Sequence, residues 1–144
     1  MSEQPLGILI VEDEALLAMD IAAVVEAADH AVVGEAASLA EVAALSESLH
    51  ADCALVDIQL LHGSSGVDAA CLLRQFYPEI CILFVTANTR SVPAGFDGAI
   101  GILEKPFTRA GLGLAIGYMA ERAAGAAAPA WPSSLVPIRP ADDV

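Results

Sequence analysis

Four short apolar runs, each followed by a polar residue, constrain the fold of this chain more than any other feature. The runs occupy residues 7–11, 53–56, 81–85 and 100–104. Short apolar runs between polar residues are typical of strands buried on both faces of a sheet. The residues that follow these runs carry carboxylate, hydroxyl or ammonium groups: Glu12 and Asp13, Asp57, Thr86 and Lys105. In open α/β sheets, ligands bind at the carboxyl edge of the parallel strands, so we expect these groups to converge there.

Helix-length segments alternate with the apolar runs. Helices are expected over residues 14–28, 38–49, 66–76 and 108–124, and one more strand is expected over 31–35. The sequence therefore predicts five βα units. Right-handed crossovers between them give an α/β fold, a doubly wound five-stranded parallel sheet with helices on both faces.

Local patterns refine two of these elements. Ser38 and Glu41 form a capping box, which predicts that a helix begins at Ser38. Segment 88–98 contains one proline and two glycines, so any helix there is expected to be short or irregular.

The composition changes at residue 125. We expect one domain over residues 1–124, followed by an alanine- and proline-rich tail over 125–144 that is too short to form an output domain. Trp131, Leu135 and Ile138 nevertheless make the tail more apolar than a solvated linker. Two alternatives stay open: a disordered tail, or a tail that docks on its own domain or on a second copy of the chain.

The charge of the chain restricts its partners. The net charge is −13, and Lys105 is the single lysine. This balance argues against nucleic acid as a partner, because phosphate backbones require lysine and arginine. An acidic cluster in an acidic chain suggests a divalent cation and a docking partner with some basic character. The alternative is that acidity only keeps an apolar domain in solution.

Several absences from the sequence favour a cytoplasmic protein. The N-terminal residues do not resemble a signal peptide, and no apolar run approaches the ~18 residues that span a bilayer, so no membrane association is expected. Cys53, Cys71 and Cys81 are odd in number, form no metal-binding pair and lie in apolar sequence. We expect them to be buried free thiols in a reducing compartment.

The strand-end groups suit phosphoryl transfer. Glu12, Asp13 and Asp57 supply hard oxygen ligands, which favour Mg²⁺ over zinc. Asp57 stands alone after a central run and is the best candidate nucleophile, whose attack on phosphorus would give an aspartyl phosphate. Lys105 and Thr86 could supply a positive charge and a hydroxyl donor to the transferred group.

Each of these residues alone has an ordinary structural interpretation. Lys105 could be a surface lysine, Thr86 a strand-end threonine, and Glu12 with Asp13 could cap the N-terminus of a helix. Their joint occurrence at successive strand ends, in this order, favours the functional interpretation.

Residues 6 to about 122 resemble the receiver domain of bacterial two-component response regulators. The matching motifs are I-L-I-V-E-D-E, A-L-V-D, F-V-T-A and E-K-P-F, together with Gly66 before the third helix. The resemblance implies strand order 2-1-3-4-5 and phosphotransfer from a histidine kinase to Asp57. It further implies Mg²⁺ held by Glu12, Asp13, Asp57 and the backbone carbonyl of Gln59. It also implies a Lys105–Pro106 peptide that is commonly cis, and a small residue, Ala87, that leaves room for the phosphoryl group.

The chain departs from the family pattern on the face that ordinarily signals output. Ile102 stands where receivers usually carry Tyr or Phe, and Leu61 replaces a proline. Segment 88–98 is shorter and richer in proline and glycine than usual. We predict that phosphorylation rearranges this segment and that Ile102 only packs. His62 is interpreted as an exposed loop residue and not as a base.

Two amides flank the expected phosphorylation pocket. Gln59 and Asn88 could orient water near the acyl phosphate, but amides take up protons poorly, so neither is interpreted as a general base.

Three functions are compatible with this sequence. The first is a single-domain response regulator that is phosphorylated on Asp57 and signals to a downstream protein target. The second is an enzyme of the haloacid-dehalogenase type, but such enzymes carry a second acid two residues after the nucleophile, where this chain has Gln59. The third is a degenerate receiver that acts as an interaction module without phosphorylation. A homodimer is expected through the last strand and helix, where Gly113 and Gly117 could permit close approach, and through the tail.

Overall fold

The computed structural model describes residues 5–45, 49–125 and 129–142. Their centre is a sheet with the strand order β2-β1-β3-β4-β5-β6. The strands are β1 (Gly7–Val11), β2 (Ala31–Ala36), β3 (Cys53–Asp57), β4 (Cys81–Thr86), β5 (Ala99–Glu104) and β6 (Leu135–Val136). The first five strands are parallel and follow the predicted order 2-1-3-4-5. The prediction of a five-stranded sheet was wrong by one strand, because β6 adds an antiparallel pair at the outer edge of β5.

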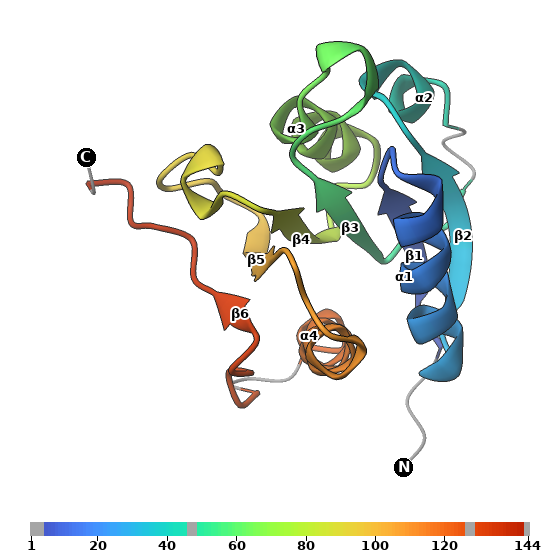
Figure 1. Cartoon of the computed structure of the whole chain (residues 1–144), viewed down its shortest axis with the longest axis vertical. Coiled ribbons are helices and arrows are strands. Elements are labelled where there is room, and N and C mark those ends of the chain that lie inside the picture. The colour runs from blue at the N-terminus through green and yellow to red at the C-terminus, as the bar shows by residue number, and fades with distance from the viewer. Residues whose placement is uncertain (1–4, 46–48, 126–128, 143–144) are drawn as a thin grey trace.

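Helices cover both faces of the sheet (Figure 1). They are α1 (Ala15–Ala27), α2 (Leu39–Ala43), α3 (Gly66–Phe76) and α4 (Arg109–Ala123), with 3₁₀ turns η1 (Leu61–Gly63) and η2 (Thr89–Ser91). Helices α2 and α3 pack on one face, while α1 and α4 pack on the other. This is the doubly wound arrangement that the alternating pattern predicts. None of the helices in the described ranges is long and apolar enough to cross a membrane.

The central strands are buried because helices cover both of their faces. All residues of β1 and β3 are buried, as are all but the first residue of β4. Alternate side chains enter opposite cores: Ile8 and Leu55 face α1 and α4, whereas Leu9 and Val56 face α2 and α3. A strand that packs against an apolar core on both faces needs an apolar residue at every position, which explains the continuous apolar runs in the sequence.

Helix α2 begins as predicted but ends early. The Ser38 hydroxyl accepts a hydrogen bond from the Glu41 amide at 3.1 Å, and the Glu41 carboxylate accepts one from the Ala37 amide at 2.8 Å. The helix ends at Ala43 instead of continuing to residue 49, and residues 46–48 of the predicted helix lie outside the described residues. The capping box therefore predicted the start of α2 correctly, whereas the spacing of apolar residues predicted an end that is too far along the chain.

Segment 88–98 contains η2 as its only helical turn, as its proline and two glycines predict. The Asn88 side chain caps this turn by accepting a hydrogen bond from the Arg90 amide at 3.1 Å. Gly95 and Gly98 have positive φ angles of 72° and 97°, so the backbone here bends in ways that other residues rarely adopt. The connection from β4 to β5 therefore lacks the regular helix that covers the other crossovers.

The described part of the tail lies along the edge of the sheet (Figure 1). We call residues 129–142 the strap. Its central residues form β6, in which Val136 pairs with Ile102 and Leu135 pairs with Leu103. Of the alternatives left open by the sequence, this structure shows docking of the tail on its own chain.

The opposite edge of the sheet is formed by β2. Its register against β1 shifts between Ile8 and Leu9, so Val33 has no partner in β1. Such an extra residue is a β-bulge, which bends and twists a strand locally.

The cysteines match the prediction in part. Cys53 is buried and Cys81 is partly buried, but Cys71 on α3 is exposed, so the prediction that all three are buried was wrong for Cys71. All three are free thiols.

Candidate functional site

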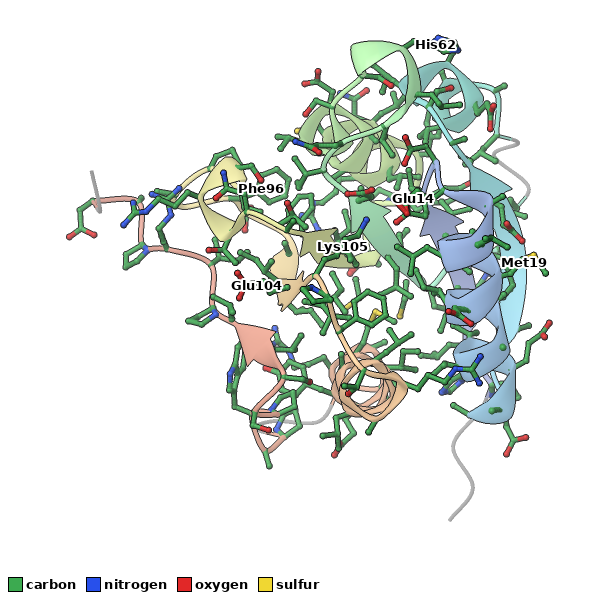
Figure 2. All side chains as sticks on the ribbon, viewed as in Figure 1. Glu14, Met19, His62, Phe96, Glu104 and Lys105 are labelled. Carbon is green, nitrogen blue, oxygen red and sulfur yellow. The ribbon has the colours of Figure 1, made fainter. Side chains whose placement is uncertain are left out.

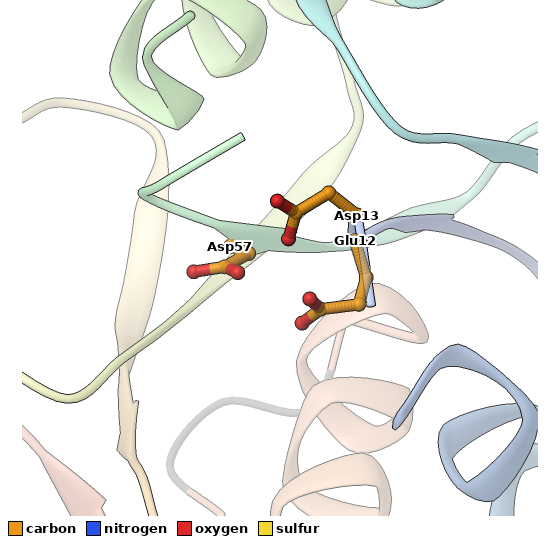
Figure 3. A group of neighbouring side chains, drawn as sticks. All are labelled: Glu12, Asp13 and Asp57. Carbon is orange, nitrogen blue, oxygen red and sulfur yellow. The ribbon is translucent and has the colours of Figure 1, made fainter. Parts of the chain in front are cut away.

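Three carboxylates meet at the carboxyl edge of the sheet (Figure 3). Glu12 and Asp13 follow β1 directly, and Asp57 is the last residue of β3, the neighbouring strand. One carboxylate oxygen from each residue lies within 4.8 Å of the others. Glu12 and Asp57 are buried, whereas Asp13 is partly exposed. The topology therefore brings together the three acidic residues that the sequence singles out.

Lys105 reaches into this cluster from the end of β5. Its Nζ donates to Asp57 Oδ2 at 3.1 Å and to Glu12 Oε1 at 3.2 Å. Figure 2 shows the side chain directed toward the centre of the carboxyl edge. The Lys105–Pro106 peptide is cis, in agreement with the family resemblance. A single ammonium group thus bridges two of the three acids.

The electrostatics of the cluster reflect its burial. Desolvation raises the pKa of Glu12 to about 7, and the charge of Asp57 adds to this effect, although the Glu14 amide and Lys105 oppose it. Burial alone would lower the pKa of Lys105, but its hydrogen bond to Asp57 and the charges of Asp57 and Glu12 outweigh burial and raise it. Lys105 therefore stays charged, while burial favours the neutral form of Glu12.

This donor set fits a divalent cation with oxygen ligands. Three carboxylates face one ammonium group, which leaves two negative charges in excess when all are ionised. The set contains neither histidine nor cysteine, and Mg²⁺ prefers such oxygen ligands. A bound cation would relieve the repulsion among these acids, because it adds positive charge beside them.

Backbone contacts fix the position of Asp57. The Gln59 amide donates to Asp57 Oδ1 at 3.2 Å. Gly66, the first residue of α3, donates its amide to the Ile58 carbonyl at 2.7 Å. A Cβ at Gly66 would overlap the carbonyl group of Asp57, so only glycine allows α3 to begin this close to β3.

Thr86 lies at the same edge, but its hydroxyl is engaged elsewhere. It ends β4, next to β3, and it is 3% exposed. Its Oγ1 accepts from the Asn88 amide at 3.1 Å and lies 3.3 Å from both the Asn88 carbonyl oxygen and Ser91 Oγ. The hydroxyl is thus bonded to the η2 turn, in contrast to Lys105, which already contacts the acids.

The structure places the residues at which the chain departs from the family pattern. Ile102 is 2% exposed and packs in the core that faces α2 and α3, with Phe84 as its register partner in β4. His62 is exposed at the tip of the η1 turn (Figure 2), as predicted for a loop residue. Leu61 in the same turn is also exposed.

Two residues that sequence reasoning missed connect the site to the strap. Ser91 contacts the Thr86 hydroxyl, and Arg139 of the strap hydrogen bonds to the segment that contains η2. Ser91 follows Asn88 by three residues, a spacing at which turn side chains often meet, so a local signal existed. No local signal marks Arg139, because it is distant from η2 in the sequence and contacts it only in the folded chain.

Comparison with known families gives one extended match. A model of the response regulator receiver domain matches residues 8–116, which is most of the chain. The matched segment contains all the strand-end residues described above.

Individual relatives agree with this match. The phyllosphere-induced regulator PhyR of Methylorubrum extorquens is 48% identical over 82 residues, which cover 56% of this chain and 30% of that protein. The solution structure of the PhyR receiver domain of Erythrobacter litoralis superposes with a TM-score of 0.70 at 26% identity, covering 83% of this chain and 90% of that one. PhyR of Bartonella quintana, described as an anti-anti-sigma factor, has a TM-score of 0.63 at 29% identity and covers 85% and 53%. The chain spans about half or less of the length of the curated relatives that it matches.

Proposed function

The chain belongs to the family of response regulator receiver domains, and we propose that it accepts a phosphoryl group on Asp57 from a histidine kinase and signals through contacts with other proteins. Receiver domains of this kind are signalling proteins and not classical enzymes, which disfavours the haloacid-dehalogenase alternative. The observation that carries the proposal is the Lys105 bridge, which places a fixed positive charge 3.1 Å from Asp57 within the acidic cluster.

The proposed reaction is a displacement at phosphorus. An oxygen of the Asp57 carboxylate forms a bond to phosphorus while the phosphorus–nitrogen bond of the donor phosphohistidine breaks, and the histidine nitrogen takes up a proton. Asp57 needs no base for this attack because a carboxylate is already ionised. The role of the surrounding residues is to position this carboxylate and to offset charge.

The chain supplies these functions from several elements. The Gln59 amide and the Gly66 contact hold Asp57 in place, and Lys105 Nζ meets negative charge on the transferred group. We propose that Glu12, Asp13, Asp57 and the backbone carbonyl of Gln59 hold Mg²⁺. When bound, Mg²⁺ would contact phosphoryl oxygens and offset their charge.

The Thr86 hydroxyl would complete the set after transfer. It lies at the end of the strand next to Asp57, and a phosphoryl oxygen is a stronger acceptor than the neutral groups that it now contacts. Its reorientation would therefore accompany phosphorylation.

The surface near Lys105 suits a docking kinase. A cavity of about 340 Å³ lies between α1 and the start of α4, with Leu17, Phe107 and Leu112 in its lining. On α1, Leu16 and Met19 are 81% and 66% exposed, and Figure 2 shows Met19 directed outward. Exposed apolar side chains beside the phosphorylation site favour contact with a protein partner. We propose a cytoplasmic location, in which the three free cysteines would remain reduced.

Chemical phosphorylation tests the proposal directly. The chain is incubated with acetyl phosphate and Mg²⁺, and incorporated phosphate is compared between wild type and Asp57→Asn. We expect incorporation in wild type only, dependent on Mg²⁺, with the acid stability and base lability of an acyl phosphate. Equal incorporation in both proteins, or none in either, would favour the degenerate receiver that acts without phosphorylation.

A further inference from the structure

Two of the three cysteines are neighbours at the edge of the sheet where the strands begin, opposite the acidic cluster. Cys53 is the first residue of β3 and Cys81 is the first residue of β4, and the two are register partners in this parallel pair. Both belong to the side of the sheet that packs against α1 and α4. The Cys81 amide donates to the Asp52 carbonyl at 3.0 Å, so a backbone hydrogen bond joins the two strands at this level.

This pairing places the two thiols where a disulfide can form. Neighbouring strands lie about 4.8 Å apart, and Cα atoms that are joined through a disulfide lie about 4.4–6.8 Å apart. Register partners also direct their side chains to the same face of a sheet. Little movement of the backbone is therefore needed to bring the sulfur atoms of Cys53 and Cys81 together, although both are free thiols in this structure.

The two thiols differ in their access to solvent. Cys53 is 0% exposed, whereas Cys81 is partly buried and lines a cavity of about 500 Å³. The charged residues that line the same cavity are two arginines and two acids: Arg74, Arg122, Glu79 and Asp97. A small oxidant in this cavity can therefore meet Cys81, but it cannot reach Cys53 directly.

The protonation of the pair shows the same asymmetry. A hydrogen bond with Cys53 lowers the pKa of Cys81; burial opposes this effect, and the charge of Arg122 adds to it. The same hydrogen bond, burial and the charges of Cys81 and Asp52 all raise the pKa of Cys53. The thiolate is the nucleophilic form of cysteine, and reactive thiols typically lie partly exposed beside a positive charge. Cys81 meets this description, whereas Cys53 does not.

We propose that Cys81 is an oxidation site for hydroperoxides and that Cys53 is its resolving thiol, so that the pair forms a reversible disulfide between β3 and β4. The pair lies at the opposite edge of the sheet from Asp57, so its oxidation does not require phosphorylation. This redox site is separate from the phosphoryl transfer proposed above.

The reaction has two steps. In the first, the Cys81 thiolate attacks one oxygen of the hydroperoxide; a sulfur–oxygen bond forms, the oxygen–oxygen bond breaks, and the released hydroxide or alkoxide takes up a proton. In the second, the Cys53 sulfur attacks the sulfenic acid on Cys81; the disulfide forms, the sulfur–oxygen bond breaks, and hydroxide leaves with the Cys53 proton as water. The two sulfur atoms lose two electrons in total, and the peroxide oxygens gain them.

The disulfide is reversible by thiol–disulfide exchange with a dithiol reductant, which restores both thiols. Disulfides in a reducing compartment are usually transient and serve catalysis or redox sensing. The reduced pair in this structure is therefore the resting form of the site, and the disulfide is its oxidised form.

Peroxide treatment followed by peptide mass analysis tests the disulfide. The chain carries Cys71→Ser, which removes the exposed thiol. It is treated with hydrogen peroxide, the remaining thiols are alkylated, and the denatured product is digested with trypsin. Arg74 lies between the two cysteines, so digestion gives peptides 1–74 and 75–90 with one cysteine each. We expect these two peptides to stay joined until a reductant is added.

Single substitutions in the same background separate the roles of the two thiols. With Cys53→Ala, oxidation of Cys81 should stop at the sulfenic acid, which dimedone traps as a stable adduct on peptide 75–90. With Cys81→Ala, Cys53 should stay reduced, because the oxidant cannot reach it. A cooperative unfolding transition in each variant shows that it is folded.

Arg122 provides a test that leaves both cysteines in place. Arg122→Gln should slow the oxidation of Cys81 several-fold, because the positive charge of Arg122 favours the thiolate. Arg109→Gln is the matched control, since it removes the same charge from the opposite end of α4, where Arg109 pairs with Asp20. It should leave the rate of oxidation at the wild-type level.

Two further measurements test what the folded sheet contributes. In denaturing urea the disulfide should form several-fold more slowly than in buffer, because the strands no longer hold the cysteines side by side. An equal rate in urea would show that their pairing in the sheet has no role. Asp57→Asn should be oxidised at the wild-type rate, and a slower reaction would contradict the separation of this site from phosphoryl transfer.

The remaining outcomes overturn the proposal at particular residues. Oxidation of Cys71 in the wild-type chain, while Cys81 stays reduced, would exclude Cys81 as the oxidation site. A sulfenic acid that dimedone traps on Cys81 in the presence of Cys53, without a disulfide, would exclude Cys53 as the resolving thiol. Either result would leave phosphorylation of Asp57 untouched, and a chain that fails to accept phosphate could still form the disulfide.

Discussion

The two halves of the carboxyl edge differ in how their polar groups are held. At the ends of β1 and β3, the acids are close together and already joined through Lys105. At the end of β4, the Thr86 hydroxyl faces away toward η2, and the strap holds the segment beyond it. The first half is arranged for its chemistry before any phosphoryl group arrives. The second half would have to change when one does.

We call Glu12, Asp13, Asp57 and Lys105 the acidic half, and Thr86, segment 88–98 and the strap the strap half. The acidic half would carry out phosphoryl transfer, and the strap half would respond to it. The acidic half rests on buried strands and on backbone contacts, which leave its carboxylates few alternative positions. The strap half consists of one 3₁₀ turn, glycines with positive φ angles and a two-residue strand. Segments with few buried contacts open at low free-energy cost and are the usual source of switching elements.

Leu135→Ala should have the largest effect on stability and should separate the two halves most clearly. Removal of a buried leucine side chain is expected to lower the free energy of unfolding by about 2–5 kcal/mol. Chemical denaturation measures this loss. Phosphorylation of Asp57 should keep its wild-type rate, because Leu135 contacts none of the acids; a parallel fall in that rate would erase the distinction between the halves.

Lys105→Met should affect the acidic half alone. Loss of the positive charge near Asp57 is expected to slow phosphorylation by acetyl phosphate by roughly a hundredfold. The rate of phosphate incorporation at saturating Mg²⁺ provides the measurement. Trp131 emission should not change, since Lys105 makes no hydrogen bond or ion pair with a described strap residue. An unchanged rate would show that the ammonium group has only a structural role.

Gly66→Ala tests how far the acidic half depends on the backbone. The added Cβ would overlap the carbonyl of Asp57, so α3 must move away from β3, at an expected cost of about 1–3 kcal/mol in unfolding free energy. The movement should also slow phosphorylation by displacing Asp57. Gly113→Ala is the control, because a Cβ there meets no described atom within 4 Å. Wild-type behaviour of Gly66→Ala would mean that α3 does not fix Asp57.

Ile102→Val should have the smallest effect and tests whether Ile102 only packs. Loss of one methylene from the core should cost about 0.5–1.5 kcal/mol of unfolding free energy. Chemical denaturation measures that cost. Addition of beryllium fluoride and Mg²⁺, which act as a phosphoryl analogue, should change the quenching of Trp131 fluorescence as much as it does in wild type. A lost fluorescence response would assign Ile102 a part in switching.

The sequence predicted the acidic half well because its information is local. A strand buried on both faces must be apolar throughout, so Glu12 and Asp57 stand out at the points where burial ends. Parallel strands then bring their carboxyl ends to one edge, whatever the lengths of the helices between them. These two facts were sufficient to place the acids together.

The strap half was harder to predict because its contacts are long-range. Leu135 and Val136 form too short a strand to produce an alternating pattern, and the neighbouring prolines left a disordered tail as an open alternative. Arg139 contacts the Arg90 carbonyl of η2 across 49 residues of chain. Only the three-dimensional arrangement reveals this contact.

The bulge in β2 has a consequence for how such sheets could associate. The sheet has two ends, and β2 ends the one opposite the strap. Unpaired Val33 and the exposed Glu35 make that end irregular and charged, which discourages strand addition. Any addition of a strand from another chain would therefore be expected at the end of the sheet opposite β2. A molecule that can extend in one direction only forms pairs and does not polymerise into fibres.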